Sequence, residues 1–180
     1  MNILLLPGLY NSGPDHWQSI WQQNLSDVSR VEQQDWDAPT QESWVAQLDQ
    51  AIHASNANVV LVAHSLGCAL LAWWVQSGVS SPETLAKVKA GFLVAPPDVA
   101  RPAFPAQSFA PMPTLTLPFP SIVIASENDP WCDLALSEQW AKAWGSEFHC
   151  IGAKGHINGE AGLEDWKQGL GWLSGLMKKI

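Results

Sequence analysis

The chain has few positively charged residues. It carries 9 lysines and arginines against 17 aspartates and glutamates, which gives a formal net charge of -8 over 180 residues. A surface of that sign repels the phosphates of nucleic acids and of anionic lipids. We therefore expect neither nucleic acid nor a membrane surface to be a partner of this protein.

The sequence also lacks a hydrophobic run long enough to cross a membrane. Its apolar N-terminal segment, residues 2–6, is interrupted at once by Pro7-Gly8 and has no positively charged stretch before it. A secretory signal or a membrane span needs a longer apolar run. The segment is therefore predicted to be a β-strand, and the protein is predicted to be cytoplasmic.

Cysteine is scarce, and no pattern typical of a metal or phosphate site is present. The three cysteines are odd in number and form no CxxC pair, which fits a reducing compartment. No HExxH motif or paired Cys/His spacing suggests zinc. The interval from Gly8 to Gly13 has the length of a phosphate loop, but Pro14 stands where that loop requires a lysine, and no GxGxxG pattern occurs.

The segments that are present alternate between two kinds. Apolar or β-branched runs predict strands at 2–6, 28–33, 59–63, 90–95, 121–126 and 147–152, and the segments between and after them predict helices at 14–25, 41–55, 68–78, 80–89, 133–144 and 163–177. This alternation predicts an α/β fold, a three-layer α/β/α sandwich with a mostly parallel sheet of about six strands. The length fits a single domain, residues 1–180.

One stretch is too rich in proline to be a regular element. Residues 96–120 hold eight of the 13 prolines. Because proline removes a backbone donor and fixes φ, so many of them prevent a helix or a central strand. We expect an irregular excursion across the top of the sheet, where ligands of such folds bind.

The most informative stretch is the pentapeptide AHSLG at positions 63–67. It joins the buried strand 59–63 to the helix that starts near Cys68. A strand, a sharp turn and a helix around a serine form a nucleophile elbow, which projects the serine Oγ above the edge of the sheet. Ser65 is therefore the predicted nucleophile. His64 is predicted to pack under the turn, because adjacent residues of an elbow point in different directions.

A serine nucleophile needs a base within hydrogen-bond reach and a third group that fixes the tautomer of that base. On the parallel-sheet interpretation, Ser65 follows the third strand, Asp129 the fifth and His156 the sixth. All three then lie at the carboxyl edge of the sheet, in the chain order of the α/β-hydrolases. Two alternatives stay open: Asp98 is a rival acid after the fourth strand, and Asp129-Pro130 is also typical of a turn that caps the next helix.

These residues resemble those of a known family. Over nearly its whole length the chain is similar to the small serine hydrolases of the α/β-hydrolase superfamily typified by retinoblastoma-binding protein 9 and the YdeN-like predicted esterases. The motifs that carry the resemblance are Pro7-Gly8 with Gly13-Pro14-Asp15-His16-Trp17, Asp35-Trp36-Asp37-Ala38-Pro39 with Trp44, His64-Ser65-Leu66-Gly67, Asn128-Asp129-Pro130, Trp144-Gly145 and Gly155-His156-Ile157-Asn158.

The resemblance implies a compact α/β-hydrolase fold without a lid, with Ser65 as nucleophile, His156 as general base and Asp129 as the orienting acid. It also implies hydrolysis of carboxylic esters or amides with neither a metal nor an organic cofactor. The Leu-x-Cys-x-Glu motif for which the mammalian relative is named, and which docks on a pocket protein, is absent, because the segment 66–70 lacks the glutamate. Pocket-protein binding is therefore not expected.

An oxyanion hole needs two N–H donors. The first is expected to be Leu66, the residue after the nucleophile. The second should come from the turn after the first strand, where Pro7-Gly8 stands in place of the His-Gly of many superfamily members. Leu9 and Tyr10 are the two candidates, and the proposed mechanism uses Leu9.

Bulky residues near the same edge are the expected walls of the substrate pocket. These are Tyr10, Trp36, Trp131 and the segment 96–120, and their bulk favours small or flat acyl groups. The predicted function is a serine hydrolase that acts on small-molecule esters, amides or aminoacyl substrates through an acyl-enzyme. A transferase or thioesterase with the same triad is indistinguishable at this level. The alternative from another class is a catalytically silent hydrolase-fold binding module, because a fold does not imply a function.

Overall fold

The computed structural model describes residues 1–180 and contains one six-stranded sheet. All neighbouring strands are parallel, in the order β2-β1-β3-β4-β5-β6. The strands are β1 (Asn2–Leu6), β2 (Val28–Arg30), β3 (Val59–His64), β4 (Val88–Val94), β5 (Ser121–Ala125) and β6 (Glu147–Cys150). The predicted α/β class and the mostly parallel sheet of about six strands are confirmed.

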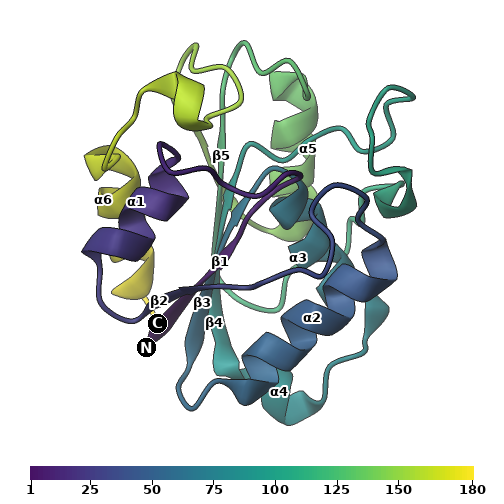
Figure 1. The fold of residues 1–180 in the computed structure, drawn as a ribbon, viewed down its shortest axis with the longest axis vertical. Helices are drawn as coiled ribbons and strands as arrows, with labels where there is room; N and C mark the ends of the chain where they lie inside the picture. Colours follow the sequence, from purple (N-terminus) through teal and green to yellow (C-terminus); the bar gives the residue numbers. More distant parts are fainter.

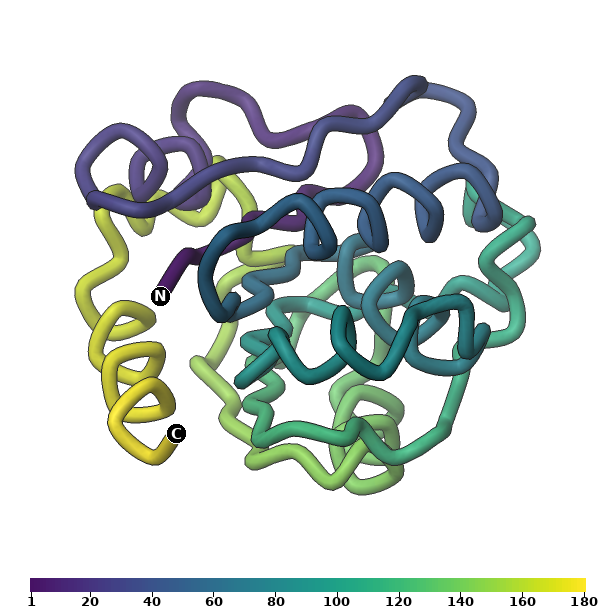
Figure 2. The backbone as a smooth tube through the Cα atoms, turned by 90° about the horizontal axis from the view of Figure 1, so that it is seen from below, coloured from purple at the N-terminus to yellow at the C-terminus, as the bar shows by residue number.

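Six α-helices cover the two faces of the sheet. They are α1 (Trp17–Asn24), α2 (Gln41–Ala54), α3 (Leu66–Ser77), α4 (Pro82–Lys87), α5 (Leu134–Trp144) and α6 (Lys167–Met177), and short 3₁₀ turns lie at Gln107–Phe109 and Gly159–Ala161. Figure 1 shows α1 and α6 on one face and the other four helices on the opposite face. Seen from below, the two chain termini lie close together (Figure 2).

The central strand β3 shows why the sheet is buried on both sides. Every residue of this strand is buried, and neighbouring side chains point to opposite faces. Leu61 and Ala63 join the core cluster beneath α2, α3 and α5, whereas Val60 and Val62 join the cluster beneath α1 and α6. A continuous apolar run is the expected sequence of a parallel strand covered by helices on both faces.

Several predicted boundaries are wrong by a few residues, for identifiable reasons. The first helix begins at Trp17 because His16, in extended conformation, is its N-cap. The last helix begins at Lys167, four residues later than predicted, because Gly162, Glu164 and Trp166 adopt positive φ. The fourth helix ends at Lys87, where the chain turns directly into β4.

The proline-rich segment 96–120 is irregular, as predicted, apart from one 3₁₀ turn at Gln107–Phe109. It still contributes buried side chains, among them Val99, Phe104 and Phe109. The excursion is therefore anchored to the core on the side of α2, α3 and α5. Of the helices described above, none is both long and apolar enough to cross a membrane.

Candidate active site

The turn between β3 and α3 places Ser65 in a strained conformation. Its φ is 54° and its ψ is -123°, a region that non-glycine residues rarely occupy. The backbone N–H of Ser65 donates to the Val94 carbonyl of β4 at 2.9 Å, which ties the turn to the neighbouring strand. Backbone strain of this kind persists only where its surroundings enforce it, and it is the expected geometry of a nucleophile elbow.

Two glycines allow the chain to pack closely around the elbow. A Cβ at Gly67 would overlap the Leu6 carbonyl oxygen, and it would lie 3.0 Å from the carbonyl oxygen of Pro7. A Cβ at Gly8 would lie only 2.7 Å from the Ser65 Cβ. The end of β1 and the start of α3 can therefore approach each other only because both positions lack a side chain.

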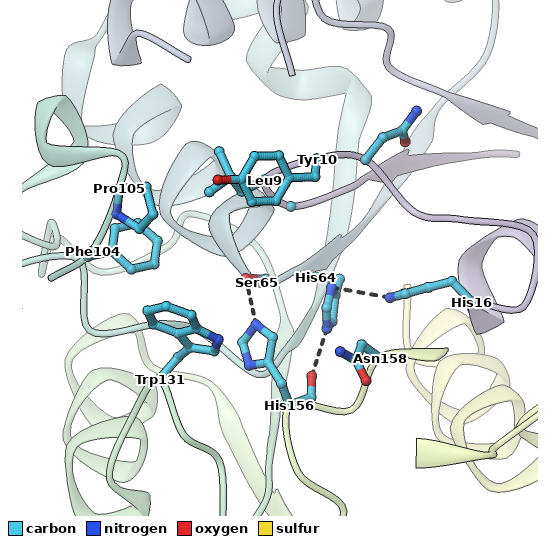
Figure 3. Close-up of a pocket in the computed structure, with 12 residues that line it drawn as sticks. Leu9, Tyr10, His16, His64, Ser65, Phe104, Pro105, Trp131, His156 and Asn158 are labelled. Carbon is cyan, nitrogen blue, oxygen red and sulfur yellow. Dashed lines mark hydrogen bonds between the residues drawn. The ribbon is translucent and has the colours of Figure 1, made fainter. Parts of the chain in front are cut away.

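Ser65, His156 and Asp129 lie in one hydrogen-bonded line. The Ser65 Oγ lies 2.7 Å from the His156 Nε2, and the His156 Nδ1 lies 2.9 Å from both carboxylate oxygens of Asp129. Figure 3 marks the contact between Ser65 and His156 with a dashed line. The Asp129 side chain is only 4% exposed and that of His156 is 12% exposed. With His156 neutral, its Nδ1–H donates to the carboxylate, and Nε2 accepts the serine proton.

The rival acid lies outside this line. An Asp98 carboxylate oxygen accepts from the Ala100 N–H at 3.1 Å and makes no hydrogen bond with His156. Asp129 also accepts from the Trp131 N–H at 2.9 Å, which holds the carboxylate in its turn. The carboxylate after β5, rather than the one after β4, therefore faces the histidine.

Asn128, next to the carboxylate, joins the two loops that carry Asp129 and His156. The Asn128 Oδ1 accepts from the Gly155 N–H at 2.7 Å and from the Ser126 hydroxyl at 3.0 Å. The Lys154 N–H donates to the same serine oxygen at 2.8 Å. These bonds fix the spacing of the acid and the base independently of their own contact.

Two backbone N–H groups beside Ser65 are available as oxyanion donors. Leu66 is the first residue of α3, so its N–H has no acceptor within the helix. The Leu9 N–H donates no hydrogen bond within the chain, whereas the Tyr10 N–H donates to the Trp36 carbonyl at 3.0 Å. Of the two candidates in the turn after β1, Leu9 therefore has the free donor.

Ser65 and His156 open into a cavity of about 330 Å³. Its lining residues are Gly8, Leu9, Tyr10, Asn11, His16, His64, Ser65, Phe104, Pro105, Trp131, His156 and Asn158. Figure 3 shows Phe104, Pro105 and Trp131 grouped on one side of the serine. The Phe104 and Trp131 rings meet edge to face, with their centroids 5.8 Å apart. This side of the cavity is an aromatic wall.

Three of the expected substrate-binding elements lie at the cavity, and one does not. Tyr10 and Trp131 line it, and the excursion 96–120 contributes Phe104 and Pro105. Trp36 is not among the lining residues; its ring packs edge to face against Trp44, 5.5 Å between centroids. Trp36 contributes to the site through its backbone carbonyl, which accepts a hydrogen bond from the Tyr10 N–H.

His16 and Asn158 line the cavity although the sequence reasoning gave neither a role there. Both belong to motifs that carry the family resemblance, but no local pattern indicates that the start of α1 and the loop after β6 meet. His64 is buried under the elbow and hydrogen-bonds both His16 and the His156 carbonyl (Figure 3).

Neither of the two buried cysteines competes with Ser65 as a nucleophile, and the exposed Cys150 is not among the residues that line the cavity. Cys68 and Cys132 are buried, and burial raises the pKa of the Cys132 thiol to about 12 and also raises the pKa of the Cys68 thiol. A protonated thiol is a poor nucleophile. The chain has no cluster of three or more His, Cys, Asp or Glu side chains arranged to hold a metal ion.

Comparison with known proteins agrees with the geometry. The family model described as "Serine hydrolase" matches residues 3–175. A YdeN-like hydrolase from Pectobacterium atrosepticum is 30% identical, with 98% of this chain and 90% of that chain covered and a TM-score of 0.86. The ydeN gene product of Bacillus subtilis is 17% identical, with 98% of both chains covered and a TM-score of 0.74.

A more distant structural neighbour is carboxylesterase CesB from Bacillus subtilis, at 12% identity and a TM-score of 0.64, with 98% of this chain and 83% of that chain covered. The search of curated proteins found no match. The family match spans nearly the whole chain, so the resemblance drawn from the sequence is confirmed. The chain belongs to the serine hydrolase family, with YdeN-like structural neighbours, within the α/β-hydrolase superfamily.

Proposed function

We propose that the protein hydrolyses carboxylic esters of small molecules, and amides of the same shape, through an acyl-enzyme on Ser65. The observation that carries the proposal is the unbroken line of hydrogen bonds from Ser65 through His156 to Asp129, open to a cavity with an aromatic wall. The likeness to a carboxylesterase fold supports the ester chemistry. The mechanism needs only protein groups and water.

In the first half-reaction the Ser65 Oγ attacks the carbonyl carbon while the His156 Nε2 takes the hydroxyl proton. The carbonyl oxygen becomes an oxyanion between the Leu66 and Leu9 N–H groups, and each such donor typically contributes two to three orders of magnitude in rate. Asp129 accepts from the His156 Nδ1–H and stabilises the imidazolium. His156 then gives its proton to the leaving alcohol or amine, which departs as the tetrahedral intermediate collapses.

In the second half-reaction a water molecule attacks the acyl-enzyme through the same series of steps. His156 takes a proton from the water, the hydroxide oxygen adds to the acyl carbon, and the acid leaves as the Ser65 Oγ regains the proton. The products are the carboxylic acid and the free enzyme.

The cavity limits which acyl groups fit. Its volume of about 330 Å³ lies at the lower end of the range for small-molecule sites, and the Phe104 and Trp131 rings close one side. We propose a preference for short or flat acyl groups over long chains.

A series of p-nitrophenyl esters from acetate to decanoate tests the proposal. We expect turnover of the wild type to be highest for the short esters, and Ser65→Ala to lose about four to six orders of magnitude in kcat. Turnover by pure Ser65→Ala close to that of the wild type would refute the mechanism. A folded wild type that turns over no ester would favour the catalytically silent binding module, and a preference for long chains would refute the inference on size.

A further inference from the structure

His64 contacts the backbone of the triad histidine, whereas Asp129 contacts its ring. Its Nε2 lies 2.9 Å from the carbonyl oxygen of His156. A carbonyl oxygen can only accept, so the Nε2 of His64 must carry a proton. His64 therefore holds the backbone of His156 by a donated hydrogen bond, while Asp129 holds its side chain.

The hydrogen bonds of His16 determine which ring nitrogens of His16 and His64 carry protons. The Gln18 backbone N–H donates to the His16 Nδ1 at 3.1 Å, so this nitrogen is bare. A neutral His16 then carries its proton on Nε2, which lies 3.3 Å from the His64 Nδ1. The whole line runs from the Gln18 N–H through His16 and His64 to the His156 carbonyl, with one donor and one acceptor at each step. Figure 3 shows the two bonds of His64 in this line.

Both histidines are placed where the neutral form is favoured. Burial, with the nearby charge of Arg30, lowers the pKa of His16 from 6.5 to about 3. Burial also holds the pKa of His64 well below its ordinary value. A proton added to His64 would fall on its Nδ1, where it would oppose the donor of His16. The arrangement of protons is therefore fixed at neutral pH.

The loop that these bonds hold is itself strained. Ile157, directly after His156, has a φ of 50°, which is a rare conformation for a β-branched residue. Its carbonyl oxygen accepts from the Trp17 Nε1–H at 2.8 Å. Two successive carbonyls of the loop are thus bonded by side chains from β3 and α1. Such strain persists only where the surroundings enforce it.

We propose that His64, its tautomer set by His16, is a positioning residue that fixes the backbone of His156 and keeps the His156 imidazole aligned between Ser65 and Asp129. The inference rests on the proposed function, because it assigns His64 a role in that reaction. It gives the base a second support: the Asp129 carboxylate orients the His156 ring, and the donated hydrogen bond from His64 fixes the His156 main chain.

A pair of variants of matched size separates the donor from the packing. In His64→Gln the side-chain amide keeps a donor for the His156 carbonyl and an acceptor for His16, whereas His64→Met has the same length and offers neither. We expect His64→Met to lower kcat about 10- to 100-fold, the cost of a misplaced catalytic group, with KM within about twofold of wild type. His64→Gln should recover most of that loss.

Two results would overturn the proposal: His64→Met with wild-type kcat, or equal losses in both variants, since the donor would then not matter. Histidine ring ¹⁵N NMR of the wild type gives a test that does not depend on a variant that folds. We expect the rings of both His16 and His64 to be neutral and protonated on Nε2 at pH 7. A charged His64, or one protonated on Nδ1, would contradict the assignment.

The NMR experiment also separates this inference from the proposed function. If the wild type hydrolyses no ester while His16 and His64 show the expected tautomers, the proposed function fails and the hydrogen-bond line stands. If the wild type is active and His64→Met is equally active, the positioning role fails and the function stands.

Discussion

The buried histidine pair should make the protein unusually sensitive to mild acid. In the folded state the pKa of His16 is about 3, against an ordinary value of 6.5 in the unfolded chain. Between these values the unfolded chain binds a proton that the folded protein does not, so the free energy of unfolding falls as the pH falls. From pH 7 to pH 5, His16 alone should cost about 2 kcal/mol of stability. His64 acts in the same direction, because its pKa is lowered too.

Urea unfolding of the wild type and of His16→Asn at pH 7, 6 and 5 measures this effect. Asparagine is among the best N-cap residues, so the variant keeps the cap of α1 while it removes the titrating ring and the hydrogen bond of that ring to His64. We expect the loss of stability between pH 7 and pH 5 to be smaller in the variant by about 2 kcal/mol. Carboxylates titrate mostly below this window and contribute little to the difference.

A matched control is His53→Asn, which removes a histidine that is exposed in the folded protein. If the wild type and His16→Asn lost the same stability over the pH range, the buried neutral pair would not exist as described. The absolute stability of the variant at pH 7 does not enter the comparison, because only the change with pH is used.

Three further outcomes follow from the packing of the site. Gly67→Ala should lower the free energy of unfolding in urea by about 1–3 kcal/mol and remove most of the esterase activity, because a Cβ there overlaps the Leu6 carbonyl oxygen. A variant as stable as the wild type would contradict the close approach of β1 and α3. Trp131→Ala should raise kcat/KM for bulky esters relative to acetate about tenfold, and an unchanged ratio would remove Trp131 from the acyl wall. A thiol reagent should modify only Cys150 in the native protein, because the other two cysteines are buried; rapid modification of more than one would refute this.

The sequence was sufficient to predict the fold and the three loops that carry Ser65, Asp129 and His156. The strands β1, β3, β4 and β5 are short, mostly apolar runs, and each of the three residues lies in the loop or turn after a strand: Ser65 after β3, Asp129 after β5 and His156 after β6. Because parallel strands end at a common edge, the order of elements alone brings such loops together. The geometry at Ser65 also follows from local chemistry, since the small residues beside it permit the sharp turn.

Other features depend on contacts that no local pattern encodes. His64 contacts the carbonyl oxygen of a residue 92 positions later, and His16 reaches His64 from the N-cap of α1. Trp36 belongs to a motif near the site, yet its ring packs away from the cavity against Trp44. The late start of α6 depends on Trp166, which is buried in a left-handed conformation between helices. Long-range side-chain packing determines these positions, and the hydrophobic periodicity of the sequence does not predict such packing.

The central claim is that Ser65 is an activated nucleophile oriented by His156 and Asp129. Labelling of the purified protein with a fluorophosphonate probe tests it without knowledge of the natural substrate. We expect the wild type and Asp98→Asn to be labelled at similar rates, Asp129→Asn to be labelled far more slowly, and Ser65→Ala not to be labelled at all. A well-folded wild type that the probe fails to label, or a Ser65→Ala protein that it still labels, would contradict the account.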